Sequence, residues 1–338
     1  MNSYIMAADI GATKTNIGIF QPQAEELERV AVRSFKSCAE DEFIDRIKEF
    51  AAVEMGQGGL LATCFGVAGP VVNGRVVATN LGLELDEKTL QRELSCPSLK
   101  LVNDLVATAA ALPVLENSDV VSLQTVHTSK VTNQEETIAI LAPGTGLGMA
   151  FLVDGRQLKI LSSEGGHADF APRDEEEVEL WRYLKRRFGR VSRERVISGP
   201  GLVNIFDWLR ERQTDKSSDA VSLPVSLPGK ISGADVVLAA VAGDLMAGKS
   251  LEFFTSILGG VAGDLVLTGM ASGGLYLAGG IPAKIIDFLG RGQFLTAFNA
   301  KGRMSAWLEQ VPVKVVLNPE AALIGAARIA RQQIPTTY

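Results

Sequence analysis

One pattern occurs twice in this chain and constrains its fold more than any other feature. Residues 5–13 are an apolar run that ends in Asp-Ile-Gly-Ala-Thr, and residues 138–146 are an apolar run that ends in Pro-Gly-Thr-Gly. Each run predicts a buried strand that passes through a glycine and threonine turn into a returning strand. Because each copy begins one half of the chain, we expect two related halves that present their turns to a shared ligand.

The order of the other predicted elements indicates an α/β protein with two domains. A chain of 338 residues exceeds the usual size of a single hydrophobic core. Three strands are expected to form an antiparallel meander, helices and strands then alternate as far as Pro113, and a polar stretch precedes a second series. Turn residues and apolar spacing further predict a hairpin at 71–77, helices at 202–210, 235–246 and 251–270, and a surface loop at 213–229.

A pair of polar residues, Asn103 and Asp104, follows the short apolar strand expected at residues 99–102 and precedes an alanine-rich helix. Carboxyl ends of strands are where open α/β sheets place their ligands, so Asp104 is a candidate catalytic carboxylate. Asn and Asp are also among the best helix N-caps, and this stretch alone favours a cap.

Charge and cysteine content exclude several classes of function. The net charge is −6, without a long basic run, which argues against nucleic-acid binding. The three cysteines are widely spaced, so we expect neither a disulfide framework nor a zinc site. We expect no signal peptide and no membrane span, and therefore a cytoplasmic protein.

The two glycine turns have a chemistry that suits phosphate. Glycine lets backbone N–H groups approach an anion closely, Thr13 and Thr145 add hydroxyl donors, and Asp9 offers a carboxylate for Mg²⁺ through water. Each turn taken alone is better explained as a tight hairpin. A Walker A motif is absent, but the two turns together with Gly279-Gly280 favour nucleotide binding.

Six motifs occur in order along the chain. They are Asp-Ile-Gly-Ala-Thr at 9–13, Leu-Val-Asn-Asp at 101–104, Gly-Thr-Gly-Leu-Gly at 144–148, Glu-Gly-Gly-His at 164–167, Arg-Val-Ile-Ser-Gly-Pro-Gly at 195–201 and Leu-Ala-Gly-Gly at 277–280. This series resembles that of the bacterial glucokinases, which have the two-domain actin-like ATPase (ribonuclease H-like) fold and are related to the repressor–kinase (ROK) sugar kinases. The resemblance extends from residue 4 to about 331.

The resemblance implies a role for each matching residue. It implies an ATP-dependent glucokinase of glycolysis that phosphorylates the 6-hydroxyl of D-glucose in an interdomain cleft, with Asp104 as general base. The implied sugar ligands are Asn103, Asp104, Glu164, His167 and Glu194. The implied ATP contacts are Asp9, Ile10, Gly11, Ala12, Thr13, Gly144, Thr145, Gly279 and Gly280, with Mg²⁺ near Asp9.

The same resemblance sets the expected domain boundaries. The last helix, at residues 320–332, is expected to return to the first domain. We therefore expect a small α/β domain of residues 1–114 with 318–338 and a large α+β domain of residues 115–317. Whether the chain forms a homodimer is left open.

Alternatives to a glucokinase stay open where the chain departs from the family. Ala12 replaces the second glycine that is usual in the first turn, so this turn must tolerate a methyl group. Leu81 stands where a tryptophan is common, which leaves a kinase for another hexose or an amino sugar as an alternative. A sugar-sensing regulator is a further alternative of a different class. It is disfavoured because the first strand begins near Tyr4, without room for a helix-turn-helix.

Overall fold

The structure, a computed structural model, describes residues 2–11, 13–23, 26–78, 83–126, 136–154, 159–216 and 231–334. It divides into two compact units. The first comprises Met1–Asn117 and Asn318–Tyr338, and the second comprises Ser118–Leu317. Each unit has its own sheet, and the order of its strands determines where the candidate site residues lie.

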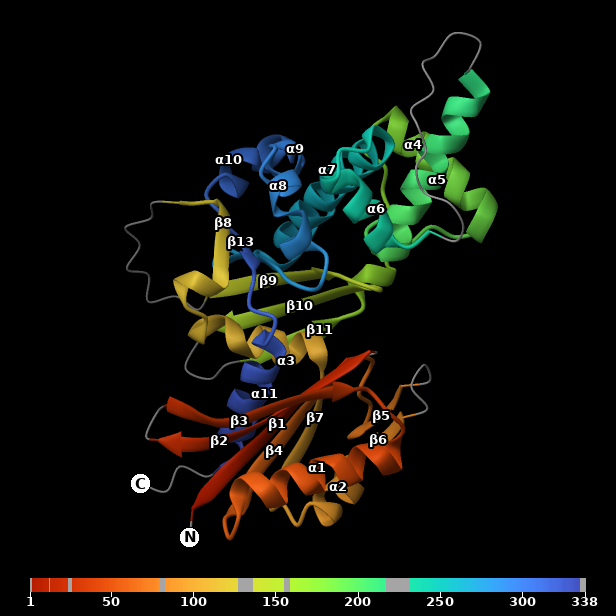
Figure 1. Ribbon diagram of the computed structural model, residues 1–338. Helices are drawn as coiled ribbons and strands as arrows, with labels where there is room; N and C mark the ends of the chain where they lie inside the picture. Colours follow the sequence, from red (N-terminus) through yellow and green to blue (C-terminus); the bar gives the residue numbers. More distant parts are fainter. Residues whose placement is uncertain are drawn as a thin grey trace. The chain divides into compact units, whose positions relative to one another are not determined.

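A five-stranded mixed sheet in the order β3-β2-β1-β4-β7 forms the centre of the first unit (Figure 1). The first three strands are an antiparallel meander, as predicted, whereas β1, β4 and β7 run parallel. The strands span Ser3–Ile10 (β1), Lys14–Gln23 (β2), Glu26–Lys36 (β3), Gly59–Val67 (β4) and Leu99–Asn103 (β7).

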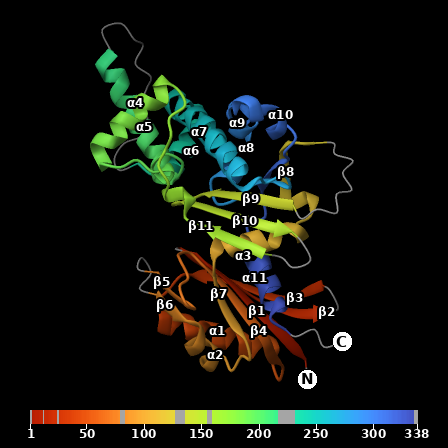
Figure 2. The same cartoon turned by 180° about the vertical axis from the view of Figure 1, so that it is seen from behind.

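Helices cover both faces of this sheet. On one face, Phe43, Ile47 and Phe50 recur at helical spacing on α1 and pack against alternate residues of β1, such as Met6 and Ala8. On the opposite face, α11 packs against β1, β4 and α3 (Figures 1 and 2). The helices span Glu40–Met55 (α1), Glu87–Glu93 (α2), Asp104–Ala111 (α3) and Ala321–Gln332 (α11).

The hairpin predicted at residues 71–77 is only partly correct. Its Asn-Gly turn forms, with Asn73 and Gly74 at φ of 51° and 73°, but the two sides share a single bridge. Pro70 would lie opposite Val77 in a longer hairpin and has no N–H to continue the ladder. The second side instead pairs with a strand that the sequence pattern did not predict; these strands span Arg75–Ala78 (β5) and Leu83–Asp86 (β6).

The second unit contains a six-stranded sheet in the order β11-β10-β9-β12-β13-β8. Its first five strands repeat the directions of the sheet in the first unit: an antiparallel meander beside parallel strands. β8 is antiparallel to β13 at the edge. The strands span Val120–Gln124 (β8), Glu136–Pro143 (β9), Leu147–Asp154 (β10), Lys159–Ser163 (β11), Gly274–Leu277 (β12) and Val313–Val316 (β13).

The helices of the second unit gather around α7, which lies among α5, α6 and α9 (Figure 1). By length and composition α7 could cross a membrane, but 67% of its most apolar window is buried, as is typical of a core helix. The helices span Glu175–Phe188 (α4), Gly199–Lys216 (α5), Gly233–Val241 (α6), Leu245–Gly269 (α7), Ile286–Leu289 (α8), Gln293–Asn299 (α9) and Ser305–Leu308 (α10).

Three predicted helices in the second unit have wrong boundaries. The helix predicted at 251–270 begins earlier, at Leu245. The helix predicted at 202–210 runs from Gly199 to Lys216, so the start of the loop predicted at 213–229 is helical; residues 217–230 lie outside the described part of the chain. The helix predicted at 235–246 ends at Val241, because Gly243 takes a φ of 94° and Asp244 then caps α7 through the Met246 and Ala247 N–H groups.

Candidate active site

The carboxyl ends of β1, β4 and β7 meet at one edge of the first sheet. Asp9 of β1 pairs with Gly66 of β4, and Val67 of β4 pairs with Asn103 of β7. Open α/β sheets bind their ligands at this kind of edge. Four of the predicted site residues are therefore brought together here: Asp9, Ile10, Asn103 and Asp104.

The sequence leaves a helix cap and a candidate catalytic carboxylate as alternatives for the Asn103-Asp104 pair, and the structure has room for both. Asn103 is the N-cap of α3: its Oδ1 accepts from the Leu105 N–H at 3.0 Å, and its Nδ2 donates to the Gly69 carbonyl at 3.0 Å. Asp104 Oδ1 accepts from the same Leu105 N–H at 2.9 Å. This bond fixes the orientation of the Asp104 carboxylate through Oδ1.

The surroundings of these carboxyl groups favour their protonated forms. Burial, and next the charge of Asp104, raise the pKa of Asp9 to about 6, although a hydrogen bond from Asn16 and the charge of Lys14 act in the opposite direction. Burial also raises the pKa of Asp104, although hydrogen bonds from the backbone N–H groups of Leu105 and Asp104 act in the opposite direction. Perturbed carboxyl groups of this kind are typical of functional sites.

A divalent cation suits the carboxylate of Asp9. Among the residues that the structure describes, no group of three or more His, Cys, Asp or Glu side chains could hold a metal. Mg²⁺ does not need such a cage, because it keeps several waters and is held by one or two carboxylates together with substrate phosphates. A buried carboxylate whose negative charge is disfavoured by a neighbouring carboxylate is a fitting partner for it.

The first glycine turn is braced from β3. The Gly11 N–H donates to the Lys14 carbonyl at 3.0 Å, which closes the turn. Ser37 Oγ donates to the Gly11 carbonyl at 2.7 Å, and the Ser37 N–H donates to the Thr13 carbonyl at 3.1 Å. Ala12 lies outside the described residues. No motif identified Ser37, which contacts the turn only because β3 returns beside β2.

The second glycine turn joins β9 to β10. Its Gly144 N–H donates to the Gly146 carbonyl at 2.8 Å, and the Gly199 N–H at the start of α5 donates to the Gly144 carbonyl at 2.8 Å. A Cβ on Gly144 would meet no atom within 4 Å, and Thr145 is exposed. The predicted phosphate turn thus has open space on its surface and the N-terminus of an 18-residue helix beside it.

Glu194 lies against this phosphate turn. It belongs to a short 3₁₀ turn, Arg193–Arg195, that Ser192 caps. Glu194 Oε2 accepts from the Leu147 N–H at 3.0 Å, and a Cβ on Gly146 would lie 2.6 Å from the same oxygen. One carboxylate oxygen of this predicted sugar ligand is therefore bonded to the backbone that follows the phosphate turn.

The Glu-Gly-Gly-His motif forms a 3₁₀ turn, Gly165–His167, on the other side of Leu147. A Cβ on Gly166 would lie 2.1 Å from the Leu147 carbonyl oxygen, so only glycine permits this approach. Glu164 Oε2 and His167 Nε2 lie 3.8 Å apart, and both side chains are exposed. Their polar atoms are thus close enough to contact one small ligand.

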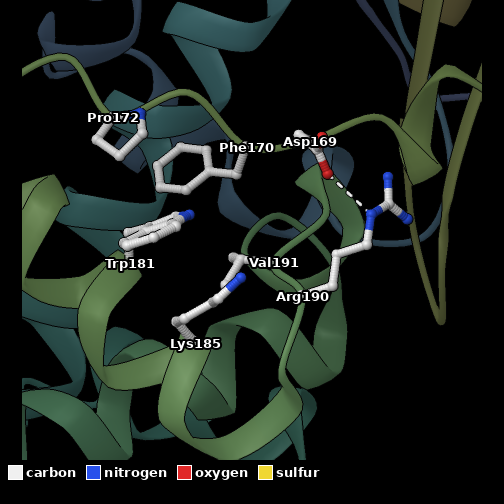
Figure 3. Close-up of a pocket in the computed structure, with 7 residues that line it drawn as sticks. All are labelled: Asp169, Phe170, Pro172, Trp181, Lys185, Arg190 and Val191. Carbon is white, nitrogen blue, oxygen red and sulfur yellow. Dashed lines mark hydrogen bonds and ion pairs between the residues drawn. The ribbon is translucent and has the colours of Figure 1, made fainter.

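Arg190 fixes the chain that leaves this turn. Its Nη2 donates to the His167 carbonyl at 2.8 Å, and its Nε donates to Asp169 Oδ1 at 2.8 Å (Figure 3). Asp169 and Arg190 also border a hollow of about 530 Å³, whose other walls include Phe170, Trp181 and Lys185. This hollow contains none of the predicted site residues, and no motif identified Arg190.

The third glycine motif lies beside the end of β9. Gly279 has a φ of 85°, and a Cβ there would lie 2.9 Å from the Pro143 carbonyl oxygen. Gly279 and Gly280 are both exposed. Because Pro143 precedes Gly144, the predicted adenosine contacts and the second phosphate turn share one edge of the sheet in the second unit.

Comparison with known proteins assigns the family. A family model for glucokinase matches residues 6–333. The chain belongs to the glucokinase family. A glucokinase from Trichormus variabilis is 38% identical over 340 residues, which cover 96% of this chain and 98% of that protein.

One solved structure supports the same assignment, and a more distant one shares the fold. The crystal structure of a glucokinase from an Antarctic psychrotroph has a TM-score of 0.81 at 28% identity and covers 98% of this chain and 99% of that one. A ROK family glucokinase from Streptomyces griseus, solved with glucose and AMPPNP, has a TM-score of 0.62 at 20% identity, with 97% and 99% covered. The predicted glucokinase family, enzyme class and two-domain actin-like ATPase fold are confirmed.

Proposed function

We propose that this protein is an ATP-dependent glucokinase that transfers the γ-phosphoryl group of ATP to the 6-hydroxyl of D-glucose, with Asp104 as the general base. The observation that carries the assignment of the base is the carboxylate of Asp104, largely removed from solvent at the carboxyl end of β7 and oriented by the Leu105 N–H. Membership of the glucokinase family supports the reaction, and the glucose and AMPPNP in the Streptomyces griseus relative support the two substrates.

The proposed role of Asp104 follows from its hydrogen bonds. Oδ1 is held by the Leu105 N–H, so Oδ2 accepts the proton of the 6-hydroxyl as that oxygen attacks the γ-phosphorus. The pKa raised by burial makes Asp104 a stronger base than an exposed aspartate. Asn103 keeps one amide hydrogen for a sugar hydroxyl, because Nδ2 uses only the other for the Gly69 carbonyl.

The remaining contacts are proposed from the geometry within each unit. Glu164, His167 and Glu194 supply acceptors and an imidazole that suit sugar hydroxyls. The Gly11 and Gly144 N–H groups close their own turns, so Thr13 and Thr145 supply the N–H and hydroxyl groups that bind phosphate oxygens. Gly279 and Gly280 contact the adenosine side. Asp9 holds Mg²⁺ through water, and the ion when bound neutralises phosphate charge.

A panel of sugars and phosphoryl donors tests the proposed substrates. Glucose, mannose and N-acetylmannosamine are each assayed with ATP, ADP and polyphosphate. We expect glucose with ATP to have the highest kcat/KM. A higher kcat/KM for mannose or N-acetylmannosamine would replace glucose as substrate, and a higher value with ADP or polyphosphate would replace ATP. The absence of any sugar-dependent phosphoryl transfer would favour a non-catalytic sugar-binding protein.

We also propose that the enzyme acts in the cytoplasm, where it would supply glucose 6-phosphate to glycolysis. The burial of α7, the one described helix that is long and apolar enough to cross a membrane, argues only that this helix belongs to the core of the second unit.

A further inference from the structure

The segment from Arg190 to Gly199 contacts both the Glu-Gly-Gly-His turn and the second phosphate turn. At its start, Arg190 donates to the His167 carbonyl, and the Arg193 N–H donates to the Ala168 carbonyl at 2.9 Å. At its end, the Gly199 N–H donates to the Gly144 carbonyl. Ten residues thus connect the proposed sugar contacts to the proposed ATP contacts of the second unit.

The backbone of this segment is firmly held between those contacts. Val196, Ile197 and Ser198 are at most 1% exposed. Ser198 Oγ donates to the Glu194 carbonyl at 2.7 Å, and Asn204 Nδ2 donates to the Arg195 carbonyl at 2.9 Å. Because the backbone around Glu194 is fixed, a movement of its carboxylate displaces the groups that the carboxylate contacts rather than the backbone of the segment.

The backbone of Leu147 receives any such displacement. Its N–H is bonded to Glu194 Oε2, and its carbonyl oxygen, in the next peptide group, lies so close to Gly166 of the Glu-Gly-Gly-His turn that only glycine fits there. Leu147 also follows the phosphate turn directly in sequence. A shift of that turn on binding phosphate must therefore move a residue whose backbone contacts both Glu194 and the Glu-Gly-Gly-His turn.

We propose that Glu194 is a positioning residue that couples sugar binding to nucleotide binding through its hydrogen bond to the Leu147 N–H. This inference rests on the proposed function of the site. The sugar orders the carboxylate of Glu194, the carboxylate orders Leu147 and the Gly144–Gly146 turn, and the ordered turn binds the phosphates of ATP better. By thermodynamic linkage, the nucleotide strengthens sugar binding by the same factor.

The test measures the dissociation constant of glucose by calorimetry, with and without saturating Mg²⁺–AMPPNP, and takes the ratio of the two values. In the unmodified protein we expect a ratio of about five or more. Glu194→Ala removes the bond to Leu147 and should bring the ratio close to one. Glu194→Gln keeps an oxygen that can accept from Leu147, so it should weaken glucose binding and preserve the ratio. Thermal melts confirm that each variant is folded.

The matched control is Glu164→Gln on the sugar turn. The carboxylate of Glu164 is 79% exposed and lies beside His167, so its loss should weaken glucose binding and leave the ratio intact. A ratio retained in Glu194→Ala, lost in Glu194→Gln or lost in Glu164→Gln would each overturn the coupling role of Glu194. So would a ratio of one in an unmodified protein that phosphorylates glucose. Failure of the unmodified protein to bind or phosphorylate glucose would instead overturn the proposed function itself.

Discussion

At the scale of single residues, the first unit keeps two carboxyl groups, those of Asp9 and Asp104, in surroundings that disfavour their charge. Burial and the charge of Asp104 raise the pKa of Asp9 from 3.8 to about 6. The negative charge that these surroundings disfavour in the free protein is the charge that would attract a cation at Asp9 and accept a proton from a sugar hydroxyl at Asp104. We therefore expect the site to reduce the stability of the fold at neutral pH.

Asp9→Asn tests this expectation. Between pH 3.8 and about 6 the folded protein binds more protons at Asp9 than the unfolded chain, so the free energy of unfolding falls as the pH rises through this window. The variant should be more stable than the unmodified protein by about 3 kcal/mol at pH 7, a difference that disappears below pH 4. Urea unfolding at pH 3.5, 5 and 7 measures it. An equal effect at all three pH values would contradict the argument.

At the scale of elements, the predicted ligand-binding residues lie on turns that follow strands, and close backbone contacts fix the conformation of these turns. The approach of Gly166 to the Leu147 carbonyl oxygen is the tightest of these contacts near the predicted sugar ligands. A side chain there would displace either the Glu-Gly-Gly-His turn or the start of β10.

Gly166→Ala should therefore raise the KM for glucose at least about tenfold, since its Cβ would lie 2.1 Å from a backbone oxygen that cannot move alone. Steady-state kinetics with varied glucose measures the change. The control is Gly248→Ala on α7, where a Cβ meets no atom within 4 Å. The control should keep the glucose KM and gain up to about 1 kcal/mol of stability. Equal KM values for the two variants would show that the contact does not shape the sugar site.

Sequence patterns predict those parts of the fold and site that depend on local order. Apolar runs mark β1, β7 and β9, and the polar pair after β7 marks the sheet edge that carries Asp104. The patterns do not predict β6, β11 or the short helices α8–α10, which have four to seven residues and too few turns to show a period. Local patterns also cannot predict contacts between residues that are distant in sequence: Glu194 bonds to Leu147 across 47 positions, and Arg190 bonds to His167 across 23.

At the scale of the whole molecule, the two units repeat one arrangement of strands. In each, a glycine turn joins the first two strands of a meander, and two parallel strands continue the sheet on the other side. The similarity of residues 5–13 to 138–146 thus corresponds to a shared topology. The first unit is completed only by the end of the chain, because α11 packs on β1, β4 and α3.

Leu323→Ala tests the contribution of α11. Leu323 is fully buried, so the truncation should lower the free energy of unfolding by about 2–5 kcal/mol. Urea denaturation measures this change. Leu238→Ala on α6 is the control: that side chain is 67% exposed, and its loss should change stability by less than about 0.5 kcal/mol. Similar values for the two variants would show that α11 adds little to the first unit.

The most direct test of the central claim, that Asp104 is the base of a glucose-phosphorylating enzyme, compares Asp104→Asn with the unmodified protein. Asp86→Asn is the matched control, because Asp86 caps another helix of the same unit, α2, through the Thr89 N–H. The measurement is kcat for glucose 6-phosphate formation, together with the dissociation constant of glucose. We predict that kcat falls by about 10²–10⁴-fold in Asp104→Asn while glucose still binds, and that Asp86→Asn keeps the normal kcat. A kcat in Asp104→Asn close to that of the unmodified protein would contradict the account.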